Sequence, residues 1–247
     1  MKNRKILLNI ILVLLVVIFL CSSYMVISTY LSKKQETQQF DVLIEKNNIN
    51  NIETKETLVD KVRVMNKDNS DLIGWVSIDG TNINYPIMYT PDEYDYYLHR
   101  NLDKDYSYSG VPFVDGNILD KRDDNPYLYG HSMLNGTMFR DLNNYHKEQY
   151  FIDHPIINID TVIRSEKYAI IAAFDAYILP EESKDFKFYH YMNFNGEFVS
   201  WKKEILNRSI YNCGQTFDEN DDFITLVTCN DDTKDGRMVV VGKRIKE

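Results

Sequence analysis

The longest apolar stretch of the chain lies close to its N-terminus. No charged residue occurs from Ile6 to Leu31, and residues 10–20 are aliphatic apart from Phe19. A helix needs about 20 apolar residues to cross a bilayer, so this run predicts a membrane-spanning helix. A cleaved signal peptide is the alternative, but its apolar region usually has only about 7–15 residues and ends in small side chains. We therefore expect an uncleaved anchor over residues 6–31.

A polar segment and then a short amphipathic helix are expected after the anchor. Residues 32–56 are rich in Lys, Gln, Glu and Asn and contain neither Gly nor Pro, which indicates a stalk or a surface helix. Leu58, Val62 and Met65 recur at helical spacing and predict a helix over about residues 53–67. The chain is thereby divided into a tip with the membrane anchor (1–31), a stalk (32–54) and one further domain (55–247).

From residue 72 onward the pattern changes to short apolar runs separated by turn residues, which is typical of β-strands. Residues 79–82 read Asp-Gly-Thr-Asn, a hairpin-type turn between the first two runs. Two helical segments are expected between strands, one around residues 138–145 and one over about 195–208 with Asn195 as its N-cap. Many short strands with few helices favour a closed barrel or a sandwich. The predicted strands are 72–78, 83–88, 111–114, 127–130, 156–163, 168–179, 223–229 and 237–245.

Charge is distributed unevenly along the chain. The 247 residues include 28 basic and 37 acidic side chains, a net charge of −9, yet residues 1–34 hold five basic side chains and no acidic one. The remainder, with 23 basic and 37 acidic residues, carries −14, which argues against binding of nucleic acid. Three basic residues precede the apolar run and two follow it, so the bias favours a cytoplasmic N-terminus. The domain after the anchor is then extracellular.

Cys229 is the candidate nucleophile, because it ends a predicted strand and opens into a polar loop, where catalytic side chains are commonly held. A buried structural thiol and a disulfide with Cys213 are the alternatives. If the last two strands form a hairpin, Arg237 lies beside Cys229, where a guanidinium would favour the thiolate and stabilise an oxyanion. The alternative role of Arg237 is an ion pair with an aspartate of the intervening loop.

His131 is the candidate base among the five histidines, because it also follows a predicted strand and precedes a loop. As a base it needs only to lie close to Cys229. No H-x-x-x-H or C-x-x-C spacing is present, and three cysteines are too few for a four-thiolate zinc site, so no metal site is expected.

Three short motifs together resemble the sortases, which are membrane-anchored cysteine transpeptidases of Gram-positive bacteria. They are Y-G-H at 129–131, T-L-V-T-C at 225–229 and G-R-M-V-V at 236–240. The order His, Cys, Arg and the N-terminal span also fit that family. The helix-containing segment between Leu179 and Phe223 resembles class B specifically, as do the helix before residues 71–75 and the stretch 83–87. The resemblance covers about residues 55–247.

The resemblance implies a closed eight-stranded sortase-type β-barrel, preceded by an N-terminal helix and a transmembrane anchor. It also implies that the Cys229 thiolate attacks the carbonyl of a threonine in a C-terminal sorting signal, with Arg237 at the oxyanion and His131 moving protons. The acyl group would pass to an amine of a peptidoglycan precursor, with no cofactor. A surface protein and the cell wall are therefore the expected partners.

The same resemblance suggests that the peptide groove is bordered by Tyr94, Leu98, Tyr129, Val227 and Thr228. Leu98 and Tyr129 would supply apolar contact and Thr228 a hydroxyl, although Leu98 is equally compatible with a core position. Val227 stands where some class B members have a hydroxyl residue, and Tyr94 stands where a polar amide is expected.

Three other functions are alternatives to this one. Papain-like proteases place Cys ahead of His, whereas here His131 precedes Cys229. A membrane-anchored binding ectodomain would use Cys229 only structurally. A pilin-polymerising sortase predicts a second span near the C-terminus, which residues 242–247 do not supply.

Overall fold

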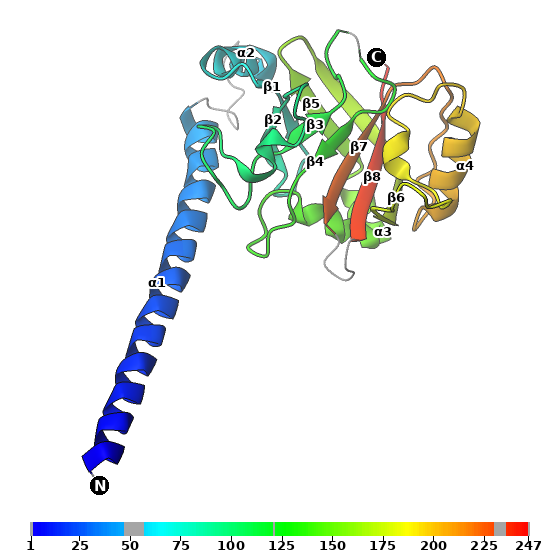
Figure 1. Ribbon diagram of the computed structural model, residues 1–247. Helices are drawn as coiled ribbons and strands as arrows, with labels where there is room; N and C mark the ends of the chain where they lie inside the picture. The colour runs from blue at the N-terminus through cyan, green and yellow to red at the C-terminus, as the bar shows by residue number, and fades with distance from the viewer. Residues whose placement is uncertain (1, 47–56, 121, 230–235, 247) are drawn as a thin grey trace. The chain divides into compact units, whose positions relative to one another are not determined.

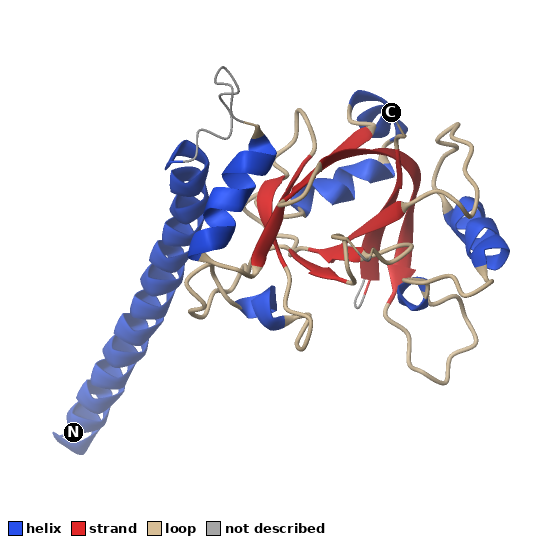
Figure 2. Cartoon of the chain, turned by 90° about the horizontal axis from the view of Figure 1, so that it is seen from above, coloured by secondary structure: helices blue, strands red, loops and turns tan. Residues whose placement is uncertain are grey.

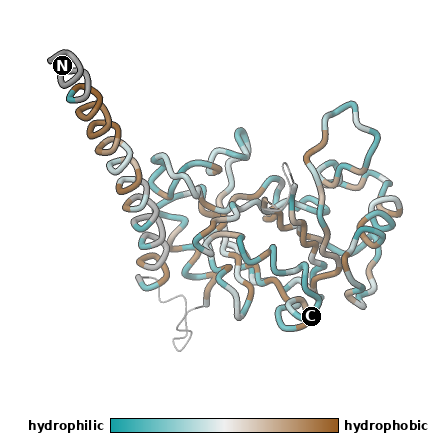
Figure 3. Tube along the Cα trace, turned by 90° about the horizontal axis from the view of Figure 1, so that it is seen from below, coloured by the Kyte–Doolittle hydropathy of each residue, from teal (hydrophilic) through white to brown (hydrophobic). Residues whose placement is uncertain are grey.

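The computed structural model describes residues 2–46, 57–120, 122–229 and 236–246. The chain forms two units, residues 1–43 and 44–247. Helix α1 (Lys2–Lys46) makes up the first unit and ends a few residues beyond its boundary, and its residues Asn9–Ser28 are long and apolar enough to cross a membrane. Figure 3 shows this hydrophobic stretch of α1. The helix therefore fits the predicted anchor, and it continues through the described part of the predicted stalk.

Helix α2 (Leu58–Asp68) opens the second unit, and its start is set by a capping box. The Thr57 hydroxyl accepts from the Asp60 backbone N–H, while the Asp60 carboxylate accepts from the Thr57 N–H at 3.2 Å. Val62 and Met65 are buried, and Arg63 donates to the Val162 carbonyl at 2.7 Å. The predicted helix is confirmed from Leu58 onward, and residues 53–56 of the prediction lie outside the described residues.

Eight strands close into a barrel, visible from above in Figure 2 and labelled in Figure 1. The order around the barrel is β1-β2-β3-β4-β7-β8-β6-β5, with β2–β3 and β4–β7 parallel and the other pairs antiparallel. The strands are β1 (Leu72–Ser77), β2 (Asn84–Met88), β3 (Phe113–Asp115), β4 (Tyr127–Tyr129), β5 (Ile156–Thr161), β6 (Ser165–Tyr177), β7 (Phe223–Cys229) and β8 (Gly236–Arg244).

All eight predicted strands are confirmed, with ends that differ by no more than three residues. The expected hairpin turn joins β1 and β2, and Gly80 there has a φ of 78°, which suits glycine. The barrel, rather than a sandwich, follows from the pairing of β1 with β5, which closes the sheet.

Short helices cover the barrel and its ends. They are the 3₁₀ helices η1 (Tyr96–His99), η2 (Arg140–His146) and η3 (Phe188–His190), and the α-helices α3 (Glu148–Asp153) and α4 (Phe198–Arg208). On α4, Phe198, Trp201 and Ile205 are buried in one cluster with side chains of β6, β7 and β8. The predicted helix around residues 138–145 is thus present as η2.

The predicted N-cap of α4 is wrong. Glu197 is the N-cap residue, and Asn195 has a φ of 50°. Asn is favoured both at N-caps and in left-handed turns, and Gly196 follows with a φ of 88°. The Asn-Gly pair therefore makes a left-handed turn that ends before the helix begins.

Candidate active site

Cys229 is the last residue of β7 and is exposed. In the β7–β8 hairpin it pairs directly with Arg237 of β8, as the sequence predicted. The predicted disulfide alternative fails, because Cys213 and Cys229 are both free thiols. Cys213 is buried, and this burial raises the pKa of its thiol to about 11. Of these two thiols, Cys229 is the one that solvent and substrate can reach.

His131 is brought to the same end of the barrel by the parallel pairing of β4 with β7, which aligns Tyr129 with Val227. Gly130, which lies between the end of β4 and His131, donates its backbone N–H to the Val227 carbonyl at 3.1 Å. A Cβ on Gly130 would lie 2.5 Å from the Phe139 ring, so only glycine fits there. The Thr228 hydroxyl donates to the Gly130 carbonyl at 2.8 Å. Hydrogen bonds therefore tie the backbone beside His131 to the strand that carries Cys229.

The imidazole of His131 has a defined orientation. Its Nε2 lies 2.9 Å from the Leu98 carbonyl, and since a carbonyl can only accept, Nε2 carries the proton. In the neutral ring, Nδ1 is then the nitrogen able to take up a proton. Gly110, at a φ of 57°, packs directly against the same carbonyl, and a Cβ there would collide with the Leu98 oxygen. Leu98 and Gly110 thus contribute to the site through their backbone.

Burial is the main cause that lowers the pKa of His131, with the Leu98 carbonyl acting in the opposite direction. The positive charge of His99, when protonated, and that of Arg237 lower the pKa further. The ring of His99 stacks on that of His131, with centroids 5.2 Å apart and an interplanar angle of 30°. The neutral imidazole is therefore favoured.

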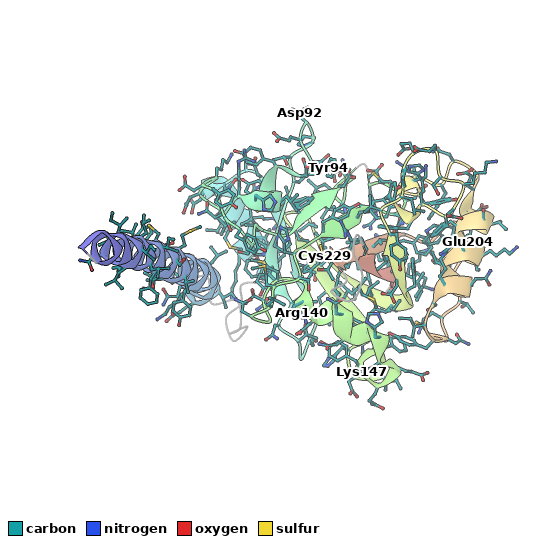
Figure 4. The ribbon with its side chains drawn as sticks, turned by 60° about the horizontal axis from the view of Figure 1, so that its bottom comes forward. Asp92, Tyr94, Arg140, Lys147, Glu204 and Cys229 are labelled. Atoms are coloured by element: carbon teal, nitrogen blue, oxygen red, sulfur yellow. The ribbon has the colours of Figure 1, made fainter. Side chains whose placement is uncertain are left out.

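Cys229, His131 and Arg237 line one pocket of about 410 Å³. Figure 4 labels Cys229 and Tyr94, which both belong to its lining. All five residues predicted to bind substrate also border it. Sequence reasoning missed six further lining residues, which are Asp95, Phe113, Asp115, Gly130, Ile178 and Tyr189.

The individual substrate candidates differ in how they meet the pocket. Tyr94 is 47% exposed, Leu98 is half-buried, and Val227 is 1% exposed. Because the Thr228 hydroxyl donates its proton to the Gly130 carbonyl, its oxygen can only accept a hydrogen bond from a ligand. Stacking of Tyr129 on Phe113, with centroids 5.5 Å apart, gives the pocket an aromatic wall.

The pocket also contains carboxyl groups away from the thiol. Asp115 has a raised pKa, first because of burial and then because of the nearby carboxylates of Asp123 and Asp95. No cluster of three or more metal-ligating side chains occurs in residues 2–46, 57–120, 122–229 and 236–246. A thiol, an imidazole and a guanidinium on one apolar pocket are the groups needed for acyl transfer through a covalent intermediate.

The comparisons with known proteins agree with this arrangement. The sortase domain family matches residues 76–245. Sortase B of Listeria monocytogenes is 32% identical over 191 residues, covering 75% of this chain and 74% of that protein. Sortase B of Staphylococcus aureus is 28% identical over 247 residues, covering 97% of each chain. The solved Staphylococcus aureus sortase B–substrate complex has a TM-score of 0.74 and 25% identity, covering 87% of this chain and 99% of that chain.

A closed barrel that carries Cys229, Arg237 and His131 on one pocket, matched over its length by that domain, places the chain in the sortase family. Its relatives narrow this to class B, so the protein is a class B sortase, a cysteine transpeptidase. Helix α1 fits the membrane anchor expected of such a protein. The papain-like protease and the non-enzymatic ectodomain considered from sequence do not fit this membership.

Proposed function

We propose that this cell-wall sorting transpeptidase cleaves a C-terminal sorting signal after a threonine and joins the new carboxyl end to an amine of peptidoglycan. The observation that carries the proposal is the direct pairing of Cys229 with Arg237 on a pocket that His131 also lines. The solved Staphylococcus aureus sortase B–substrate complex supports the proposal that this chain binds a sorting-signal substrate.

In the first half-reaction the Cys229 thiol gives its proton to Nδ1 of the neutral His131, and its sulfur attacks the threonine carbonyl carbon. A C–S bond forms while the carbonyl π electrons move to oxygen, and the guanidinium of Arg237 stabilises this oxyanion. The intermediate collapses, the C–N bond breaks, and the leaving amine takes a proton from His131. The products are a thioacyl-enzyme and the released C-terminal peptide.

In the second half-reaction an amine enters, and the neutral His131 removes its proton as it attacks the thioester. The C–N bond forms, the C–S bond breaks, and the departing thiolate of Cys229 takes the proton back from His131. The lowered pKa of His131 helps this step, because a neutral ring is available to accept the proton. We further propose a cytoplasmic N-terminus and an extracellular barrel, on the charge bias around the span.

The test uses the full chain in detergent micelles. It is incubated with a library of quenched peptides and with a series of amines that includes peptidoglycan fragments and a lysine-containing pilin-type peptide. Mass spectrometry should find cleavage after threonine, transfer to the peptidoglycan amine, and a thioacyl adduct on Cys229. Cys229→Ala should abolish all three while the protein stays folded, and Cys213→Ala should remain active. Cleavage at another residue, or transfer to the lysine peptide alone, would contradict the proposal.

A further inference from the structure

The side-chain amide of Asn143 links the end of β7, which carries Cys229, to the segment after β4, which carries His131. The Asn143 side chain, on η2, donates from Nδ2 to the backbone carbonyl of Cys229 at 3.2 Å and to the Ser132 hydroxyl at 3.1 Å. Ser132 follows His131 directly, so one side-chain nitrogen bridges the end of β7 and the segment after β4. Arg140, labelled in Figure 4, also donates to the Ser132 hydroxyl at 3.2 Å.

We propose that Asn143 is a positioning residue that fixes the spacing between the Cys229 thiol and the His131 imidazole, an inference that rests on the proposed function. Cys229 is the last strand residue and its side chain is exposed, so packing alone holds it weakly. A hydrogen bond to its carbonyl restrains the peptide unit from which the thiol projects. The same amide restrains the residue after His131, so the two reacting groups are held relative to one another.

The oxygen atom of the Asn143 amide argues against a purely structural role for this residue. The Asn143 Oδ1 atom is buried and has no hydrogen-bond partner among the described residues. An unpaired buried acceptor is destabilising, and an apolar side chain of similar size would avoid that cost. The orientation cannot be reversed without loss, because Oδ1 would then face the Cys229 carbonyl, which only accepts. What the amide supplies at this position is the donor toward Cys229.

The helix that carries Asn143 is itself anchored to the barrel wall. His146 Nδ1 lies 2.8 Å from the Asn143 carbonyl, and its Nε2 lies 2.9 Å from a carboxylate oxygen of Asp175 on β6. The Asn143 carbonyl can only accept, so Nδ1 donates to it, and the other ring nitrogen links η2 to β6. Asp175 pairs with Met238, next to Arg237 on β8. The contacts that hold Asn143 in place therefore extend to β6 and, through its pairing, to β8, which carries Arg237.

The test compares variants of the full chain in detergent. Asn143→Leu keeps the side-chain volume but removes the N–H donor. Asn143→Gln keeps an N–H donor on a side chain that is one methylene longer. Asn144→Ala is the matched control, since the Asn144 amide donates to Asp141 on the same helix and, among the described residues, has no hydrogen bond to Cys229 or to residues 131–132. Peptide kcat and KM, the thermal midpoint, and the alkylation rate of Cys229 by iodoacetamide are measured, with the modified cysteine identified by mass mapping.

We expect Asn143→Leu to lower kcat by about 10- to 100-fold with little change in KM, because a small displacement of reacting groups is costly. Its thermal midpoint should equal or exceed that of the wild type, and Asn143→Gln should recover part of the rate. Alkylation of Cys229 should slow in Asn143→Leu and stay unchanged in Asn144→Ala. A wild-type kcat in folded Asn143→Leu, or a loss of rate that merely follows a loss of stability, would overturn the inference.

The alkylation measurement separates this inference from the proposed function. If the wild type cleaves no threonine-containing peptide, the proposed function fails, yet slower alkylation of Cys229 in Asn143→Leu would still support the positioning role. If the wild type is active and both kcat and alkylation are unaffected by Asn143→Leu, the positioning role fails while the transpeptidase assignment stands.

Discussion

At the scale of single residues, the positive charge of Arg237 opposite the Cys229 thiol has a consequence for kcat that can be measured. Arg237 pairs with Cys229 across the hairpin and lines the pocket. Loss of one oxyanion donor typically lowers kcat by about 10²–10³-fold, so we expect that loss in Arg237→Ala. Arg237→Lys keeps the charge without the planar fork and should restore part of the rate. Saturating-peptide kinetics on folded variants provide the check, and near-wild-type kcat in Arg237→Ala would leave catalysis to Cys229 and His131.

Gly110 affects the site through one carbonyl. Its φ of 57° and its contact with the Leu98 oxygen mean that a methyl group there must push this carbonyl away from His131. We expect Gly110→Ala to reduce kcat as well as stability. Gly214→Ala is the control, because Gly214 has a φ of 69° but open space around its Cβ, so it bears the backbone strain without the collision. If both variants have the same kcat, the Leu98 carbonyl does not orient the imidazole.

The lowered pKa of His131 makes a contribution to stability that depends on pH. The folded-state pKa lies below the unfolded value of about 6.5, so between the two the unfolded chain binds more protons. Stability attributable to His131 is therefore constant above about pH 6.5 and decreases as the pH falls toward the folded-state pKa. The free energy of unfolding of wild type and His131→Gln, measured from pH 8 to pH 4, should converge or cross in the acidic range. A constant difference over that range would contradict the shift.

The shared position of His131, Cys229 and Arg237 on one pocket could be predicted from sequence, because each stands at the end of an apolar run. The positions of Asn143 and His99 beside it could not, because neither residue follows a predicted strand: Asn143 lies in a polar helical segment and His99 lies among tyrosines. Their contacts with Cys229 and His131 depend on how distant segments pack. The Leu98 carbonyl has no side-chain signature at all, since any residue supplies the same atom.

At the scale of elements, the strands were predicted well because each apolar run corresponds to one wall segment of the barrel. Helix starts were harder to predict. Asn195 satisfied the sequence preference for an N-cap, yet its side chain equally suits the left-handed turn that it makes. Thr57 carried the same kind of signal and does cap α2. The two cases differ only in the tertiary path of the chain, which local preference does not contain.

The cap of α2 gives a prediction for this scale. Thr57→Ala removes the hydroxyl that accepts from the Asp60 N–H and should lower the free energy of unfolding of the barrel by about 1 kcal/mol. Val64→Ala is the control, because Val64 is exposed on the same helix and Ala is the better helix former. Denaturant titrations of both variants provide the measurement. An equal or larger loss in Val64→Ala would mean that the cap contributes nothing.

At the scale of the whole molecule, the proposed topology places the thiol outside the cell. Cys229 is exposed on the barrel and Cys213 is buried, so a membrane-impermeant maleimide added to intact cells should label Cys229. Labelling should disappear in Cys229→Ala, and lysis of the cells should not increase labelling of Cys229 in the wild type. Labelling that requires lysis would place the barrel on the cytoplasmic side and reverse the orientation.

The parallel pairing of β4 with β7 also determines the order in which the site can assemble during folding. A thiol and a guanidinium on neighbouring strands of a hairpin can meet early, because only a short loop has to close. The imidazole arrives only when β4, which lies some hundred residues earlier in the chain, docks beside β7. Contacts between such distant segments form late and slowly. A barrel that has not yet closed therefore exposes Cys229 without the histidine that is proposed to transfer its protons.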